Sequence, residues 1–238
     1  MANNSTIKSM AGTAIAEIAI IIVGVLLAFQ VESWRADRDS REQEAAQLRA
    51  LHADFVQPSS RLRRVISLQE RVVDAQSRLL RIAYQIEPRP AEDELIQVVT
   101  YAQSFHRLKA VMGAYRSLVS SGDMRLLRNA DLRASLAEFA DTLGDGYEDE
   151  ELATLLRVQM FASMSQSIDV LSTFSASYGG FEWLSEVDQS PNFDALFGNQ
   201  DYLNHIAILS VAERGQLRFY QGLLDLVNHI LDILESDC

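Results

Sequence analysis

Residues 14–34 read AIAEIAIIIVGVLLAFQVESW, and this stretch decides how the chain is built. Its central run, residues 18–29, has no polar side chain, but as a helix it is only about 18 Å long, whereas the hydrocarbon core of a bilayer is ~30 Å thick. A helix that starts at Met10 is long enough, and it then contains Glu17. We therefore predict a membrane-spanning helix over residues 10–30 that carries a carboxylate in its apolar run.

A cleaved signal peptide is the alternative for this segment. The sequence around it disfavours that alternative, because only one basic side chain, Lys8, precedes the apolar run. Residues 28–30 are Ala-Phe-Gln, which is not the small-x-small pattern of a cleavage site. We expect an uncleaved span.

One face of the predicted span differs from the rest. With 3.6 residues per helical turn, Thr13, Glu17, Gly24 and Ala28 fall on the same side. Small residues allow a second helix to approach closely, and a carboxylate inside the membrane usually faces protein or water. We predict a helix–helix interface on this face. Two alternatives remain for Glu17: a protonated or interface-reaching side chain, or part of a proton or ion path.

The residues after the span suggest how the chain sits at the membrane. Trp34 and Arg35 are expected to anchor the helix at the interface, where aromatic and basic side chains are enriched. Lys and Arg are more frequent after the span than before it. The positive-inside rule then places the large C-terminal part in the bacterial cytoplasm, beneath the inner membrane. Because long domains can be translocated regardless of flanking charge, the periplasmic side is the alternative.

The remainder of the chain has helical periodicity and no useful period-2 alternation, so we predict an all-α fold. The expected parts are a tail over residues 1–9, the span over 10–30, a helical stalk over 31–57 and an antiparallel bundle of four to six helices over 58–238. Expected breaks between its helices lie at Pro58, near residues 87–90, at Gly122, at a kink over residues 144–146, and in an irregular stretch over residues 177–198. The two helices that flank this stretch are expected to end near Ser175 and to begin near Gln200.

Composition limits the function. The 238 residues carry a net charge of −12, which argues against nucleic acid as a partner because phosphates would be repelled. The one cysteine, Cys238, excludes a disulfide framework within the chain.

We find no motif for catalysis, for a metal or for a cofactor. None of the four histidines has another at helical ligand spacing, and the sequence contains no nucleophile elbow and no phosphate-binding glycine loop. We therefore expect no enzyme activity and no bound cofactor. Aromatic residues gather around the irregular stretch, where they either hold that stretch on the bundle or form a partner surface. The candidates for the partner surface are Phe181, Trp183, Phe193 and Phe197.

Two segments resemble a family of uncharacterised bacterial single-pass membrane proteins. The anchor of that family follows the pattern G-E-I-x-L-V-x-I-G-I-L-I-A-L-Q-x-N-x-W-N. Its positions are matched here by Glu17, Gly24, Ala28, Gln30 and Trp34, with Ala16 for the usual Gly and Ser33 near the usual Asn. Residues 115–129 resemble its second signature, Y-x-x-L-x-x-S-G-x-L-x-L-I. The family has no assigned activity, so the resemblance implies an architecture and no reaction.

These features favour a non-catalytic accessory or scaffold subunit of a larger membrane protein complex, with respiratory, photosynthetic and transport assemblies as candidate hosts. Its expected partners are other membrane protein subunits and the lipid bilayer, and a homo-oligomer is a further option. The alternative is a membrane-anchored ligand-binding or sensor bundle that signals through a partner.

Overall fold

The computed structural model describes residues 4–108, 112–170, 173 and 191–237, with side chains from residue 24 onward except at 145, 147–150 and 237. Over these residues it contains six α-helices, one short 3-10 helix and no strand. The predicted all-α class is therefore confirmed.

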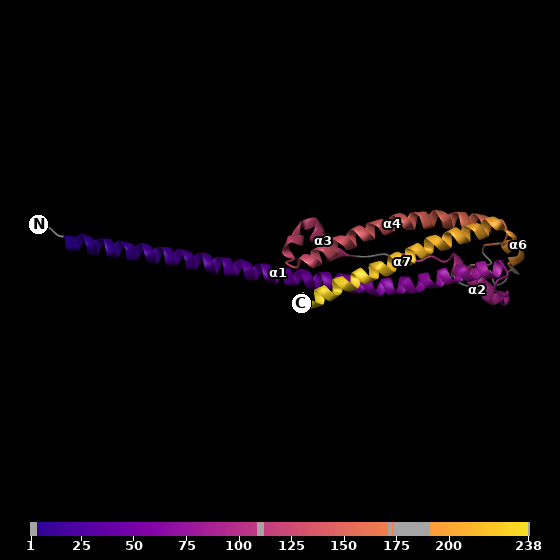
Figure 1. The fold of residues 1–238 in the computed structure, drawn as a ribbon, viewed down its shortest axis with the longest axis horizontal. Helices are drawn as coiled ribbons and strands as arrows, with labels where there is room; N and C mark the ends of the chain where they lie inside the picture. The colour runs from indigo at the N-terminus through magenta and orange to yellow at the C-terminus, as the bar shows by residue number, and fades with distance from the viewer. Residues whose placement is uncertain (1–3, 109–111, 171–172, 174–190, 238) are drawn as a thin grey trace, which may run out of the picture.

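A single helix, α1 (Asn4–Ala83), accounts for 80 residues of the chain. At 1.5 Å per residue it is about 120 Å long. Its C-terminal half lies in the bundle, whereas its N-terminal part projects beyond it as an isolated helix (Figure 1). Residues 4–9, predicted as a tail, are part of this helix.

The break expected at Pro58 is absent, because α1 continues through it. Proline removes one backbone hydrogen bond and usually kinks or ends a helix. Here Phe55 and Leu62, on either side of Pro58, are both fully buried in the same apolar cluster. Burial of both turns against the rest of the bundle outweighs the local cost. The predicted boundary between stalk and bundle at residue 58 is also too late, since Leu48 and Leu51 are already buried.

The chain then turns back through α2 (Glu92–Gln103), which packs on the C-terminal part of α1. This is the distal end of the bundle, and the proximal end is the one from which α1 projects (Figure 1). The sequence predicted no break between residues 90 and 122, but α2 ends at Gln103. Residues 104–108 follow without helix, and α3 (Gly113–Ser121) forms at the opposite, proximal end of the bundle (Figure 1). Gly122 ends α3 with φ of 75°, a left-handed conformation that glycine adopts at little cost, as predicted. The short 3-10 helix η1 (Asp123–Leu126) comes next.

The second long helix is α4 (Ala130–Met164), which begins where Asn129 accepts a hydrogen bond from the Leu132 amide. The expected kink at residues 144–146 is not a break, because α4 is continuous there. Gly146 serves packing instead, since a methyl group at this position would overlap the Phe219 ring. The helix ends at Met164, well before the predicted Ser175.

A short helix, α6 (Phe193–Gly198), lies within the stretch predicted to be irregular, and the last helix, α7 (Gln200–Asp237), runs back along the bundle. Helices α1, α4 and α7 form the body of a long rod (Figure 1). Helix α7 is antiparallel to α1, because Ser59 contacts Asn228 whereas Gln69, further along α1, contacts Glu213.

Two apolar clusters form the core of the rod. The proximal cluster lies at the end where α1 projects and includes Phe55, Leu62, Leu118, Leu132, Phe139, Tyr220 and Val227. The distal cluster includes Leu79, Leu95, Val99, Met160, Phe193, Leu203 and Ile206. Gln69 of α1, Arg157 of α4 and Glu213 of α7 are buried but belong to neither cluster. They form a polar layer between the two.

Candidate functional site

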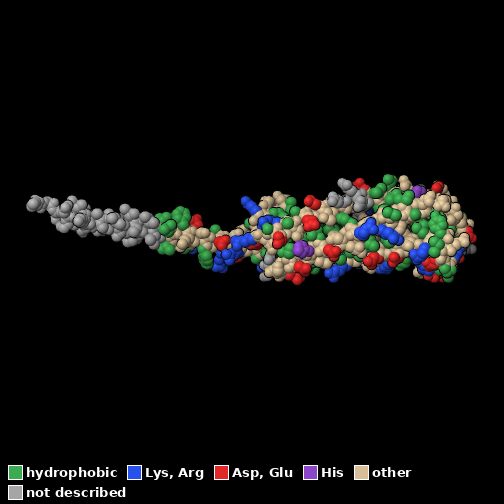
Figure 2. Space-filling view, viewed as in Figure 1, with side chains coloured by type: hydrophobic (Ala, Val, Ile, Leu, Met, Phe, Trp, Pro, Cys, Tyr) green, Lys and Arg blue, Asp and Glu red, His purple; other side chains and the backbone are tan. Residues whose placement is uncertain are grey.

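The projecting part of α1 exposes large apolar side chains around the helix. Leu26 is 58% exposed, Phe29 65% and Trp34 64%, and Val25, Leu27 and Val31 are also exposed. Figure 2 shows these apolar side chains beside the grey residues that precede them. A run of exposed apolar side chains of this length is typical of a surface that contacts lipid or another protein.

The predicted interface face is described only in part. Gly24 has open space at its α-carbon and Ala28 is exposed, so both are available to a second helix. The side chains of Thr13 and Glu17 lie outside the described residues. Within the part of the chain whose side chains are described, no helix is long and apolar enough to cross a membrane.

Charged residues follow the apolar run directly. Trp34 and Arg35, the predicted anchors, are both exposed. The Arg38 guanidinium lies 6.0 Å from the centre of the Trp34 ring and pairs with Glu42 at 3.0 Å. Asp37 binds Arg41 and also Arg128, which follows η1, both at 3.1 Å. The change from apolar to charged surface therefore falls within about one helical turn.

The aromatic partner surface is not assembled as predicted. Phe193 is only 1% exposed and belongs to the distal cluster, so it is a core residue and is not available to a partner. Phe197 is partly buried and stacks on Phe193 with ring centres 6.2 Å apart. Arg89 covers both rings and binds Asp194 at 2.5 Å. Phe181 and Trp183 lie outside the described residues.

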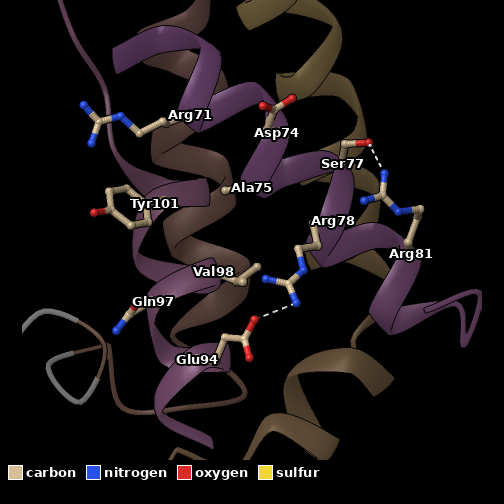
Figure 3. Close-up of a pocket in the computed structure, with 10 residues that line it drawn as sticks. All are labelled: Arg71, Asp74, Ala75, Ser77, Arg78, Arg81, Glu94, Gln97, Val98 and Tyr101. Carbon is tan, nitrogen blue, oxygen red and sulfur yellow. Dashed lines mark hydrogen bonds and ion pairs between the residues drawn. The ribbon is translucent and has the colours of Figure 1, made fainter. Parts of the chain in front are cut away.

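A groove between α1 and α2 combines charged and apolar side chains. Its volume is about 540 Å³. Ala75 and Val98 are buried at its base, and its rim carries Arg71, Asp74, Ser77, Arg78, Arg81, Glu94, Gln97 and Tyr101 (Figure 3).

Two of the three groove arginines are already paired. Arg78 binds Glu87 at 2.6 Å and Glu94 at 2.8 Å, so it joins α1 to both the turn and α2. Arg81 binds Glu87 at 3.2 Å and the Ser77 hydroxyl at 3.1 Å. The hydrogen bond from Arg78 lowers the pKa of the Glu87 carboxyl, and the same bond is the main cause of a raised pKa at Arg78. These pairs hold the hairpin between α1 and α2 in place.

The third arginine is different. In the described part of the chain, neither Arg71 nor Asp74 makes a hydrogen bond or an ion pair, and both side chains are exposed. Figure 3 shows the Arg71 guanidinium and the Tyr101 hydroxyl directed to the same side of the groove. Arg71 also acts on His106, whose pKa is lowered chiefly by burial and then by the Arg71 charge.

The polar layer lies next to this groove. Glu213 is 0% exposed and its carboxylate accepts hydrogen bonds from Gln69 and from Arg157, the latter at 2.6 Å. Arg157 is 8% exposed and stacks against Phe105, with 4.9 Å from the guanidinium carbon to the ring centre. Two polar atoms of the layer, Gln69 Oε1 and Arg157 Nε, have no partner among the described residues. A buried ion pair adds little net stability because the cost of desolvation offsets the attraction, but loss of one partner leaves the other charge buried and unpaired.

Sequence reasoning missed the groove, although a signal for it was present. Arg71, Asp74, Arg78 and Arg81 are spaced i, i+3, i+7 and i+10, which places them on one helical face. Glu94, Gln97 and Tyr101 repeat the i, i+3, i+7 spacing on α2. Such a stripe is typical of a solvated surface. Only the packing of α2 on α1 shows that the two stripes meet.

Comparison with protein-family models, with curated proteins and with solved structures finds no match to this chain. The described residues also contain no group of three or more His, Cys, Asp or Glu side chains that could hold a metal ion.

Proposed function

We propose that the chain is a single-pass protein of the bacterial inner membrane and acts as a non-catalytic accessory or scaffold subunit of a larger membrane protein complex. The observation that carries this proposal is the continuity of α1, which runs unbroken from the exposed apolar segment into the core of the bundle. A subunit that binds the exposed apolar segment of α1 would therefore also fix the position of the rod.

The dimensions support a spacer role. From Trp34 to the end of α1 at Ala83, the helix extends about 75 Å. The bundle packs on most of this length and stiffens it (Figure 1). Such a rod could contact a partner far from the membrane surface while its anchor contacts another partner within the bilayer.

Co-purification tests the proposal. The full chain is extracted from its native membranes in a mild detergent, and accompanying proteins are identified by mass spectrometry. We expect a stoichiometric set of membrane subunits, and we expect Gly24→Leu to lose them because the larger side chain blocks close helix approach. Leu26→Phe, which adds bulk on the opposite face of the same helix, is the matched control. A protein that purifies alone, or equal recovery of partners with both variants, would contradict the scaffold role.

The side of the membrane is a separate proposal, and we place the rod in the cytoplasm from the distribution of Lys and Arg. Cys238 is the one thiol of the chain, and in the sequence it follows Asp237, the last residue of α7. We expect a membrane-impermeant maleimide to label it in inside-out vesicles and not in intact spheroplasts. Labelling in spheroplasts alone would place the rod in the periplasm.

A membrane-anchored sensor is the second candidate function. The observation that favours it is the position of the groove on α1, because a ligand in the groove would touch the same helix that continues to the anchor. A thermal-shift screen of the detergent-solubilised chain tests it. A specific stabilising ligand would support the sensor, and a screen without one would leave the accessory role as the better account.

A further inference from the structure

The groove between α1 and α2 has the dimensions of a small-molecule site. Its volume of about 540 Å³ lies within the range that pockets for small organic ligands usually have. Buried Ala75 and Val98 provide an apolar base, and the exposed ring of Tyr101 provides an apolar wall. The polar groups stand around the rim, so a ligand that fits must combine an apolar body with a polar end.

Among the described residues, the ion pairs of the rim leave one cation and one anion without a partner, Arg71 and Asp74. Three arginines and two carboxylates line the groove, whereas the chain as a whole is strongly acidic. Arg78 and Arg81 are occupied by Glu87 and Glu94. Arg71 has no such partner, and its guanidinium offers a planar fork of donors that matches a carboxylate.

We infer that the groove binds a small organic carboxylate, with its carboxylate paired to Arg71 and its planar apolar body against Tyr101 and Val98. Tyr101 is the suited wall because an exposed aromatic ring gives a planar ligand a large contact area. The ion pairs of Arg78 keep α2 seated on α1, so the site is formed before the ligand arrives.

The exclusion of lipid as the source of this anion rests on the proposed membrane anchor. Arg71 lies 37 residues beyond Trp34 along a continuous helix, which corresponds to about 55 Å. Lipid headgroups at the anchor cannot reach the groove of a rod that extends away from the bilayer. The ligand is therefore a free organic acid. This inference goes beyond the proposed accessory role, and it is tested on the purified chain without partners, so the two can fail independently.

Binding is measured with the full chain in lipid nanodiscs, with 4-fluorobenzoate as the probe and its ¹⁹F resonance as the readout. Empty nanodiscs correct for uptake into lipid, and 4-fluorobenzyl alcohol serves as the uncharged analogue. We expect saturable binding of 4-fluorobenzoate with a Kd of about 1 mM or lower, as suits a ligand of this size. The alcohol should bind more weakly by about tenfold.

Three variants locate the site. Arg71→Gln should weaken binding of 4-fluorobenzoate by about tenfold, because a charge-assisted pair is lost, and Tyr101→Ala should weaken it as well. Arg64→Gln is the matched control, since Arg64 is an exposed arginine one heptad nearer the membrane on the same helix and outside the groove. Arg71 and Tyr101 are exposed, so the variants should keep the helical circular dichroism of the parent.

The inference is overturned if 4-fluorobenzoate shows no saturable binding above that of empty nanodiscs. It is also overturned if Arg64→Gln weakens binding as much as Arg71→Gln does, which would show a general charge effect. Equal affinity for the acid and the alcohol would show that the carboxylate does not contribute to binding, and this result would also overturn the inference.

Discussion

The two halves of the rod are built from the same three long helices, yet they differ in what they bury. The proximal cluster is apolar, with Phe55 and Phe139 in an edge-to-face contact at 5.1 Å. The distal half contains the groove and buries Gln76, Gln103 and Tyr202, each with an unpaired polar atom among the described residues. Unpaired buried polar groups cost stability. We therefore expect the proximal half to be the more stable part of the rod and the distal half to rearrange more easily.

Removal of an aromatic ring from the proximal core should have the largest effect. Phe139→Ala leaves a cavity opposite Phe55 and should lower the free energy of unfolding by about 3–5 kcal/mol. Chemical denaturation followed by circular dichroism measures it. Leu155→Ala removes an exposed side chain from the same helix and is the control, with an expected change within about 0.5 kcal/mol. Equal changes for the two variants would refute a stabilising proximal core.

Substitutions in the polar layer should cause the next largest loss of unfolding free energy. Glu213→Gln leaves the Arg157 charge buried without a counter-charge and should cost about 1–3 kcal/mol. The loss stays moderate because Gln69 can turn its unpaired Oε1 toward the new amide. Asp225→Asn makes the same change at an exposed position of α7 and should be neutral. If the layer is ionic as described, Arg157→Met in the Glu213→Gln background should restore part of the loss, and additive losses would argue against the pairing.

The local signals of the sequence predicted helix type well and long-range contacts poorly. Gly122, one of the predicted breaks, ends α3 because glycine adopts the left-handed conformation, and this depends only on neighbours in the chain. Pro58 and Gly146 misled the prediction, because packing against Phe219 and the proximal cluster decides their structure. The groove was missed for the same reason, since its charged stripes become a site only where α2 meets α1.

Removal of a helix cap should have a smaller effect on stability, and this effect should differ between the two halves of the rod. Asn129→Ala removes the cap of α4, a 35-residue helix that spans both halves, and should cost about 1 kcal/mol in denaturation. Asn192→Ala removes the equivalent cap of the six-residue helix α6 at the distal end. We expect this second change to raise amide exchange near α6 without a comparable loss of global stability. Equal global losses would show that the distal end is as firmly coupled as the proximal one.

Acid should loosen the distal half first, and the expected sign follows from His106. Its pKa is lowered in the folded chain by burial and by the charges of Arg71 and Arg157, partly offset by Glu213. In the unfolded chain His106 therefore becomes protonated near pH 6.5, whereas in the folded chain it stays neutral to a lower pH. The free energy of unfolding consequently decreases as the pH falls through that value. Hydrogen exchange at pH 7.5 and 5.5, corrected for intrinsic rates, should show increased exchange in α2 and residues 104–107 and little change around Phe55. His106→Gln should remove part of this difference, because the side chain no longer titrates. If the acid-induced exchange is unchanged in that variant, another group is responsible and the weakness of the distal half does not arise from His106.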